Sequence, residues 1–290
     1  MKRTITYYLI MMILLLFPGK IWAGSELSRQ FIEERLLDKG MDKSQVQSLI
    51  NDSRISTQPD IVILNLFHSA PRGTEKQPEI MCVDPKSVKM GRIFIKENKE
   101  SLAYLNTRFG TSPQIITAIL VVESKLGSYP MRYNVVSAYI NLASLLDPDY
   151  FGDIQKKYAG EYPQLHEEET IKRAQSKAQW ALDEIYDLVY LAKELKIDPL
   201  SIIGSFAGAI GPAQFIPSTF RSYGIDGDED GIRNPFNMSD AKASIGNYLK
   251  SSGWAEDAPL ANKRNAVWNY NHSQVYVNTI MQLYDELGRE

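Results

Sequence analysis

The sequence has 290 residues, a formal net charge of −3 and a hydrophobic share of 44%. A chain of this length can bury one large core or two modest ones, and its acidic balance excludes the broad basic surface of nucleic-acid binders. Its single cysteine, Cys82, excludes an internal disulfide and a cysteine zinc cluster. A cysteine nucleophile paired with His68, His166 or His272 is conceivable, but a packed thiol is the simpler interpretation.

The first residues have the pattern of an export signal. A basic start, Met1-Lys2-Arg3, precedes an apolar run from Ile5 to Phe17, and Ala23 offers a small residue for cleavage. Pro18 ends the run early for a membrane span, so a retained anchor is the less favoured alternative. We expect residues 1–23 to be removed, which takes away three cations and moves the charge from −3 to −6. No cysteine follows the run, so we expect a soluble periplasmic or secreted protein without a lipid anchor.

Most of the chain is expected to be α-helical, with at most a small hairpin. Apolar residues at helical spacing predict helices at 26–37, 43–51, 90–109, 113–126, 167–196, 239–252 and 272–287. Three prolines and a glycine between Ser69 and Lys89 predict an irregular connection. We therefore predict an N-terminal helical arm with its connection over residues 24–89 and a main helical body over residues 90–290.

A carboxylate lies on the apolar stripe of the predicted helix 113–126. Ile119 and Leu120 precede Glu123 by four and three residues, so the three side chains share one face. Apolar surroundings destabilise a charged carboxylate, so its pKa rises toward the value that a general acid needs near neutrality. A packed glutamate bonded to the backbone or to an arginine such as Arg132 fits the spacing equally well.

Small residues crowd the start of the segment from Gly204 to Ser218. Three glycines, with serine and alanines between them, allow the backbone to approach a ligand or another helix closely. Gln214 and Phe215 then offer an amide and an aromatic ring, a pairing suited to sugars. A tight helix crossing is the alternative interpretation, and the lack of a Gly-Lys-Ser/Thr ending excludes a phosphate loop.

An acidic segment from Asp226 to Asn237 is similar to the start of an EF-hand calcium loop. Asp226, Asp228 and Asp230 offer oxygen ligands at positions 1, 3 and 5, and the carbonyl of Ile232 stands at position 7. Asn237 occupies position 12, where a strong site has a bidentate glutamate. We favour a weak structural Ca²⁺ site over a solvated acidic turn, with the ion bracing the loop and taking no part in the chemistry.

Three motifs, in order and spacing, resemble those of the lytic murein transglycosylase B family. They are Val122–Gly127, the Gly204–Ser218 segment, and Tyr270-Asn271-His272-Ser273 with Tyr276. The resemblance covers roughly residues 100–280. It implies a mainly α, lysozyme-like domain that cleaves peptidoglycan between N-acetylmuramic acid (MurNAc) and N-acetylglucosamine (GlcNAc).

The resemblance also implies roles for individual residues. Glu123 corresponds to the catalytic glutamate of the family, which acts first as an acid and then as a base without a cofactor. The muramyl 6-hydroxyl then closes a 1,6-anhydro ring without water. The positions that contact the sugars correspond to Ser205, Gln214, Tyr248, Tyr270, Asn271 and Tyr276.

Two other classes of protein stay open. A hydrolytic muramidase or chitinase-like glycosidase needs a second carboxylate, for which the loop Asp226–Asp230 is a candidate. A non-catalytic wall-binding scaffold keeps the sugar contacts without the chemistry, but it has no need of a buried acid. The expected partner is a peptidoglycan strand, and no nucleic-acid partner is expected.

Overall fold

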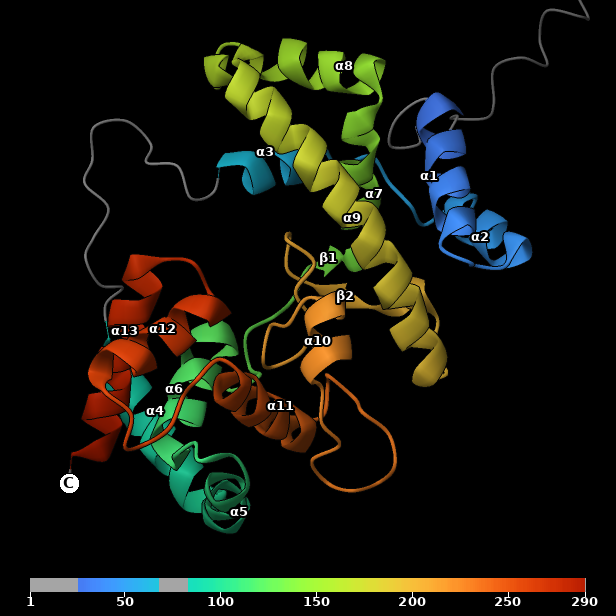
Figure 1. Ribbon diagram of the computed structural model, residues 1–290. Coiled ribbons are helices and arrows are strands. Elements are labelled where there is room, and N and C mark those ends of the chain that lie inside the picture. The colour runs from blue at the N-terminus through green and yellow to red at the C-terminus, as the bar shows by residue number, and fades with distance from the viewer. Residues whose placement is uncertain (1–25, 68–82, 290) are drawn as a thin grey trace, which may run out of the picture.

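The structure, a computed structural model, describes residues 26–67 and 83–289. The expected signal peptide, His68 and Cys82 lie outside these residues. Within them the chain is mainly α-helical, as predicted, with one two-stranded antiparallel sheet (Figure 1). No helix of the described residues has both the length and the hydropathy that crossing a membrane requires.

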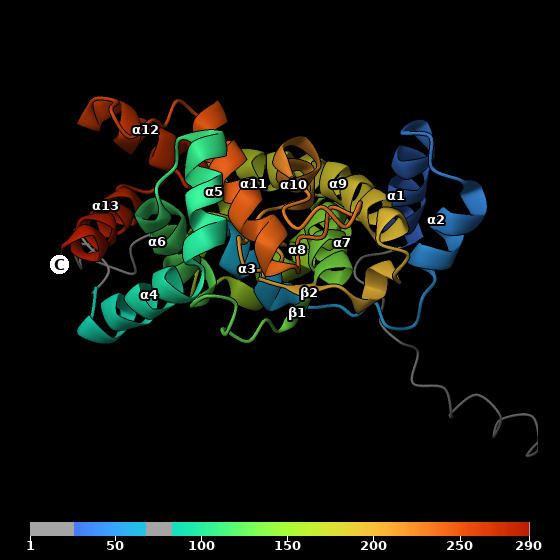
Figure 2. The same cartoon turned by 90° about the horizontal axis from the view of Figure 1, so that it is seen from below.

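The α-helices of the described residues are, in chain order, α1 (Glu26–Asp38), α2 (Lys43–Ile50), α3 (Pro59–Phe67), α4 (Pro85–Glu97), α5 (Lys99–Phe109), α6 (Pro113–Ser124), α7 (Val135–Ala143), α8 (Pro148–Tyr158), α9 (Glu168–Glu194), α10 (Pro217–Tyr223), α11 (Met238–Ser251), α12 (Leu260–Tyr270) and α13 (Gln274–Gly288). Three short 3-10 helices accompany them: η1 (Ser144–Leu146), η2 (Pro163–His166) and η3 (Pro199–Ser201). Strands β1 (Tyr133–Asn134) and β2 (Ile203–Gly204) pair antiparallel, with Tyr133 opposite Gly204. The molecule extends from α12 and α13 at one end to α1 and α2 at the other (Figure 2).

The long helix α9 organises the half of the molecule that contains α7, α8 and α10 (Figure 1). Its buried stripe includes Ala174, Ala178 and Ala181, whose small side chains allow α7 to lie close against it. All nine residues of α7 are buried, with α3 and α9 packed on the helix. Because α7 is covered on all sides, it has no exposed polar face, and its few polar side chains, such as Asn141, make buried hydrogen bonds.

The N-terminal helices pack on this same half, where α1 contacts α9 and α3 contacts α7. Asn141 of α7 holds the link between α2 and α3. Its Oδ1 accepts a hydrogen bond from the Gln58 backbone N–H at 2.7 Å, and its Nδ2 donates to the Ser56 carbonyl at 2.9 Å. The same buried side chain also accepts from the Tyr150 hydroxyl at 3.0 Å and donates to the Ser137 carbonyl at 2.7 Å. Asn141 therefore joins the arm to the body through two of its four hydrogen bonds, and the other two anchor it within the body.

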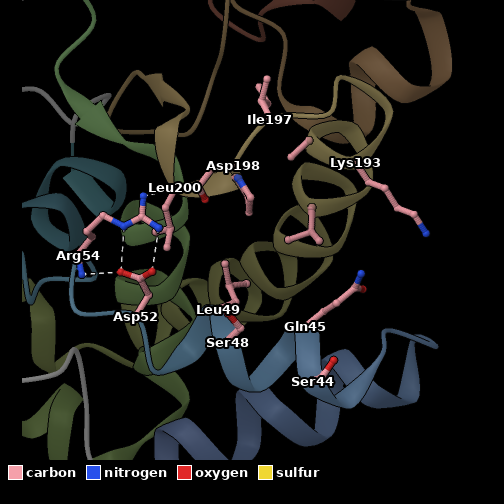
Figure 3. A pocket seen from close by; sticks show the side chains of 13 residues that line it. Ser44, Gln45, Ser48, Leu49, Asp52, Arg54, Lys193, Ile197, Asp198 and Leu200 are labelled. Atoms are coloured by element: carbon pink, nitrogen blue, oxygen red, sulfur yellow. Dashed lines mark hydrogen bonds and ion pairs between the residues drawn. The ribbon is translucent and has the colours of Figure 1, made fainter.

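A cavity of about 510 Å³ lies between α2 and the C-terminal end of α9 (Figure 3). Leu49 and Leu200 contribute apolar side chains to its lining, and Arg54 lies among the polar ones. The Arg54 guanidinium pairs with Asp52 at 2.8 Å and also with Asp198, so it connects the α2–α3 link to η3. The division of the chain into an arm and a body at residues 89 and 90 stays a prediction.

The helix predicted over 90–109 is two helices in the structure. α4 begins at Pro85, because Asp84 Oδ1 accepts a hydrogen bond from the Ser87 N–H at 2.7 Å and proline suits the first turn. Asn98 then separates α4 from α5. The predicted irregular connection to Lys89 was therefore too long at its C-terminal end.

α6 lies at the centre of the other half of the molecule. Residues 115–121 are all buried, since α4, α5, α11 and α13 pack around this helix. Lys125 (φ 49°) and Leu126 (φ 59°) end it in the left-handed conformation that glycine usually adopts. The Leu126 N–H bonds to the Leu120 carbonyl at 2.9 Å, so the helix stops before the predicted Gly127.

We expect Asn141→Leu to lower the free energy of unfolding by about 3 kcal/mol, because the change keeps the volume but leaves several buried polar groups without partners. Chemical denaturation at pH 7 measures the loss. Asn51→Ala serves as the control, because it removes an exposed side-chain hydrogen bond and should cost less than about 0.5 kcal/mol. Equal losses in the two variants would contradict the role given to Asn141.

Candidate active site

Glu123 lies in the last turn of α6, on the same face of the helix as the buried residues Ile119 and Leu120. Its side chain is half-buried, and Oε1 accepts a hydrogen bond of 2.6 Å from the Tyr276 hydroxyl of α13. Arg132, the alternative partner considered from the sequence, makes no ion pair with Glu123 within the described chain. The polar partner of the carboxylate is therefore a neutral tyrosine that lies 153 residues away in sequence.

The surroundings of Glu123 suit an acid that works near neutral pH. Burial raises its pKa to about 7, although the hydrogen bond from Tyr276 lowers it. Burial also raises the pKa of Tyr276 and Tyr270 well above the usual value for tyrosine, and the charge of Glu123 raises both further. Both tyrosines therefore stay protonated, while Glu123 exchanges its proton easily.

A row of aromatic rings continues from Tyr276. Tyr270 stacks on Tyr276 with ring centroids 6.4 Å apart, Phe215 lies 5.2 Å from Tyr270, and Tyr248 lies 5.1 Å from Tyr270. The hydroxyls of Tyr270 and Tyr248 donate to the backbone carbonyls of Ala213 and Asn269, each at 2.6 Å. Three of the predicted sugar-contacting residues thus form one cluster with Glu123. Phe215, which the sequence indicated only as part of its motif, belongs to the same cluster.

The Gly204–Ser218 segment packs against protein on more than one side. A Cβ added at Gly208 (φ +84°) would lie 2.2 Å from the Tyr139 ring, and one added at Gly211 (φ +66°) would lie 2.0 Å from the Pro235 carbonyl oxygen. Both glycines therefore permit the close approach that the sequence predicted, and the approaching groups are a buried tyrosine and the acidic loop.

Ser124 connects this segment directly to the helix of Glu123. Its Oγ donates to the Pro212 carbonyl at 2.7 Å and accepts from the Gly127 N–H at 2.9 Å. The side chain is buried, because the turn after α6 and the glycine-rich segment meet over it. Sequence reasoning missed Ser124, since its helical position points away from the apolar stripe.

Three of the predicted sugar-contacting residues make no hydrogen bond to Glu123 within the described residues: Ser205, Gln214 and Asn271. The Oγ of Ser205 accepts from the Ala209 N–H at 3.0 Å, which leaves its own O–H free to donate. Gln214, in a left-handed conformation (φ 50°), donates its Nε2 to the Gly211 carbonyl at 2.8 Å, which leaves Oε1 free to accept. Asn271 directly follows Tyr270 and is exposed.

The acidic loop brings two of the predicted metal ligands together with a further carboxylate. Carboxylate oxygens of Asp226, Asp228 and Asp240 lie within 4.8 Å of one another, and Asp240 comes from the first turn of α11. Asp230 instead accepts from the Ile232 N–H at 2.8 Å. The predicted list of Asp226, Asp228, Asp230, Ile232 and Asn237 therefore lacked a carboxylate that only the fold brings to the loop.

Asn237 is the N-cap of α11. Its Oδ1 accepts from the Ser239 N–H at 2.7 Å, and its Nδ2 donates to Asp228 at 2.6 Å. Burial raises the pKa of Asp240; hydrogen bonds from the Asn234 and Gly227 N–H groups lower it, and the neighbouring aspartates raise it further. Three close carboxylates, one of them buried, fit a hard divalent cation that would offset their repulsion.

A mainly helical body, a half-buried glutamate with a tyrosine partner and a glycine-rich segment beside it are the features that the resembling family leads one to expect. The family model described as the transglycosylase SLT domain matches residues 24–267, and the chain belongs to this family.

Among curated proteins, the chain is 25% identical to membrane-bound lytic murein transglycosylase B of Escherichia coli (strain K12) over 253 residues. The match covers 84% of this chain and 62% of the relative, so the chain spans less than two thirds of that protein.

Solved structures share the fold. The E. coli lytic transglycosylase Slt35 in complex with calcium matches with a TM-score of 0.70 and 21% identity over 91% of this chain and 95% of its own. SltB3 from Pseudomonas aeruginosa, in complex with NAG-anhNAM-pentapeptide, matches with a TM-score of 0.68 and 19% identity over 91% and 79% of the two chains.

We expect Glu123→Gln to stabilise the protein only above the unfolded-state pKa of glutamate. The folded pKa is raised, so the native state loses stability as the pH rises from about 4.5 through about 7, where Glu123 becomes charged. The variant should exceed the wild type by about 2 kcal/mol at pH 8 and match it at pH 4. Urea denaturation at both pH values measures the difference, and a pH-independent difference would contradict the raised pKa.

Proposed function

We propose that this protein is a lytic transglycosylase that cleaves the β-1,4 bond between MurNAc and GlcNAc in peptidoglycan and leaves 1,6-anhydro-MurNAc ends. The observation that supports it most is the state of Glu123: a half-buried carboxylate with a pKa near 7, bonded to a neutral tyrosine. Such a group can donate a proton and then accept one at the same pH. Family membership and the complex of SltB3 with NAG-anhNAM-pentapeptide agree with this activity.

The first step is general acid catalysis. Protonated Glu123 gives its proton to the glycosidic oxygen, the bond from that oxygen to C1 of MurNAc breaks, and the electron pair leaves with the 4-hydroxyl of GlcNAc. The positive charge that develops at C1 can be relieved by the N-acetyl oxygen of the same MurNAc, as in substrate-assisted glycosidases. We assign the orientation of this N-acetyl group to Ser205 and Asn271.

The second step closes the ring. Glu123, now a carboxylate bonded to Tyr276, accepts the proton of the MurNAc 6-hydroxyl while that oxygen forms a bond to C1. The products are the anhydro sugar and a reprotonated Glu123, so no water is consumed and no cofactor is needed. We assign the holding of the sugars to Gln214, through its free Oε1, and to the rings of Tyr248 and Tyr270.

The hydrolytic alternative needs a second carboxylate near the scissile bond. Among the described residues, burial and the Tyr276 hydroxyl account for the pKa shift of Glu123, and no carboxylate contributes. The loop that was the candidate source of that carboxylate gathers Asp226 and Asp228 around Asp240 instead. These observations favour a mechanism with one carboxylate. They also argue against a scaffold, which gains nothing from a buried acid.

Digestion of purified peptidoglycan separates the three classes of protein. We expect the wild type to release muropeptides with 1,6-anhydro ends and Glu123→Gln to lose at least about 1,000-fold in rate, because one group supplies both proton transfers. Mass spectrometry distinguishes anhydro ends from reducing ends by one water. Reducing ends would establish hydrolysis, and no release by the folded wild type would leave the scaffold.

We also propose that Asp226, Asp228 and Asp240 hold a structural Ca²⁺ ion. Pro235 of the same loop lies against Gly211, so an ion that braces the loop would also support the glycine-rich segment. The calcium complex of Slt35 is compatible with this assignment. The ion supplies no chemistry at Glu123. In the cell we place the enzyme in the periplasm or outside, where calcium in the millimolar range suits a weak site.

Calcium should raise the melting temperature of the protein. With a dissociation constant of about 0.1–1 mM, 10 mM Ca²⁺ should add roughly 3–6 °C over the protein in a chelator. Asp240→Asn should abolish the increase, whereas Asp230→Asn, outside the carboxylate cluster, should keep most of it. Scanning calorimetry with Mg²⁺ as the ionic control measures the effect, and an unchanged melting temperature in the wild type would contradict the site.

A further inference from the structure

Two helices provide the polar pair at the active site. α6 supplies Glu123 and α13 supplies Tyr276, and the two helices pack against each other (Figure 1). Glu123 lies at the C-terminal end of α6 and Tyr276 near the N-terminal end of α13, so the helices run antiparallel. Their other ends meet at a second polar contact, far from the chemistry, which the proposed mechanism does not use.

The second contact is centred on Glu256, in the segment between α11 and α12. Its Oε1 accepts from the Ser112 N–H at the start of α6 at 2.8 Å and from Trp254 Nε1 at 3.0 Å. Its Oε2 accepts from the Tyr284 hydroxyl of α13 at 2.9 Å. One carboxylate thus bonds to both helices of the active-site pair.

The charge of Glu256 suits this place. Burial raises its pKa, but the hydrogen bonds from Ser112, Trp254 and Tyr284 outweigh burial, so the pKa is lowered and the carboxylate stays charged. Lys263 lies 3.7 Å from Oε2 and donates to the Glu256 carbonyl at 2.6 Å. Ser112 is the N-cap of α6 but makes no side-chain capping bond, so Glu256 places the negative charge that a helix N-terminus favours.

We infer that Glu256 is a positioning residue for the general acid, because it fixes the register of α6 against α13 that brings the Tyr276 hydroxyl onto Glu123. This inference rests on the proposed function for its consequence in catalysis. Ser112 and Glu123 are separated by about 16 Å along α6, and Tyr276 and Tyr284 by about 12 Å along α13. The pair is therefore held at two well-separated points.

Register matters because the active-site bond is short. A slip of one residue moves a helix by about 1.5 Å along its axis, which is enough to break a 2.6 Å hydrogen bond. A carboxylate bonded to both helices opposes such a slip, because the slip would break its hydrogen bonds to one of them. A slip would leave Glu123 with its burial and without its tyrosine, so its pKa would rise.

Other charged groups near this pair point elsewhere. On α11, which also packs on α6, Lys242 donates to Asn98 and Ser101 at the junction of α4 and α5. Tyr276 and Tyr270 face Glu123 and stay neutral. Asp285 faces Tyr284 at the other end of α13. Among the described residues, the Tyr276 hydroxyl is the side-chain group that, besides burial, shifts the pKa of Glu123.

The test measures the pKa of Glu123 directly, by ¹³C NMR of glutamate carboxyls, with the signal assigned by its loss in Glu123→Gln. Tyr276→Phe should raise the pKa by half a unit or more, and Glu256→Ala and Tyr284→Phe should each raise it by about half a unit. Adding Glu256→Ala to Tyr276→Phe should raise it no further, because both changes remove the same bond. On peptidoglycan, kcat should fall about fivefold in Tyr284→Phe with little change in KM.

Asp84→Ala is the matched control, because it removes the capping carboxylate of α4, which also packs on α6. It should lower the melting temperature and leave the pKa of Glu123 unchanged. If both Glu256→Ala and Tyr284→Phe also lower the melting temperature and leave the pKa of Glu123 unchanged, the inference is overturned and Glu256 is a structural residue only. If Glu256→Ala does not fold, Tyr284→Phe decides. A wild type that releases no muropeptides overturns the proposed function, while the NMR titration still tests the register.

Discussion

The burial of one carboxylate on a mainly apolar helix is the constraint on which this structure depends. α6 is covered by four other helices along most of its length, and its one carboxylate lies in the last turn. There Glu123 loses most of its solvation and gains a single hydrogen bond from a neutral donor. Desolvation thus exceeds the compensation, which leaves the group able to hold or release a proton near neutral pH. A full ion pair at this position would have fixed the charge and removed that ability.

The supports of Glu123 come from parts of the chain that are far apart in sequence. Ser124 binds the helix end to the glycine-rich segment, and Gly211 allows that segment to rest on the acidic loop. The loop is held in turn by Asp240, whose carboxylate accepts the N–H groups of Gly227 and Asn234. The acidic loop, where we propose a cation, therefore supports the Gly204–Ser218 segment, which also contributes Phe215 to the aromatic row.

Six helices were predictable from the sequence with their ends: α1, α2, α6, α9, α11 and α13 lie within two residues of the predicted bounds. α3, α7, α8, α10 and α12 were missed. α10 has only seven residues, and every residue of α7 is buried, so that helix has no exposed polar face to mark its period. The error at Pro85 and Asn98 has another cause: capping by Asp84 and Asn98 divides one long apolar pattern into two helices.

By itself the sequence determined the helical class, the burial of Glu123 and the closeness that Gly208 and Gly211 require, because these follow from local period and backbone conformation. Only the tertiary structure decided the partners. Tyr276 bonds to Glu123 across 153 residues of chain, and Glu256 bonds to Ser112 across 144 residues. Asp240 joins Asp226 across 14 residues. No pattern of spacing encodes such pairs, since each is set by how two already formed helices or loops pack. The sequence thus identified Glu123 as the candidate acid, and the fold brought the Tyr276 hydroxyl that lowers its pKa into contact with it.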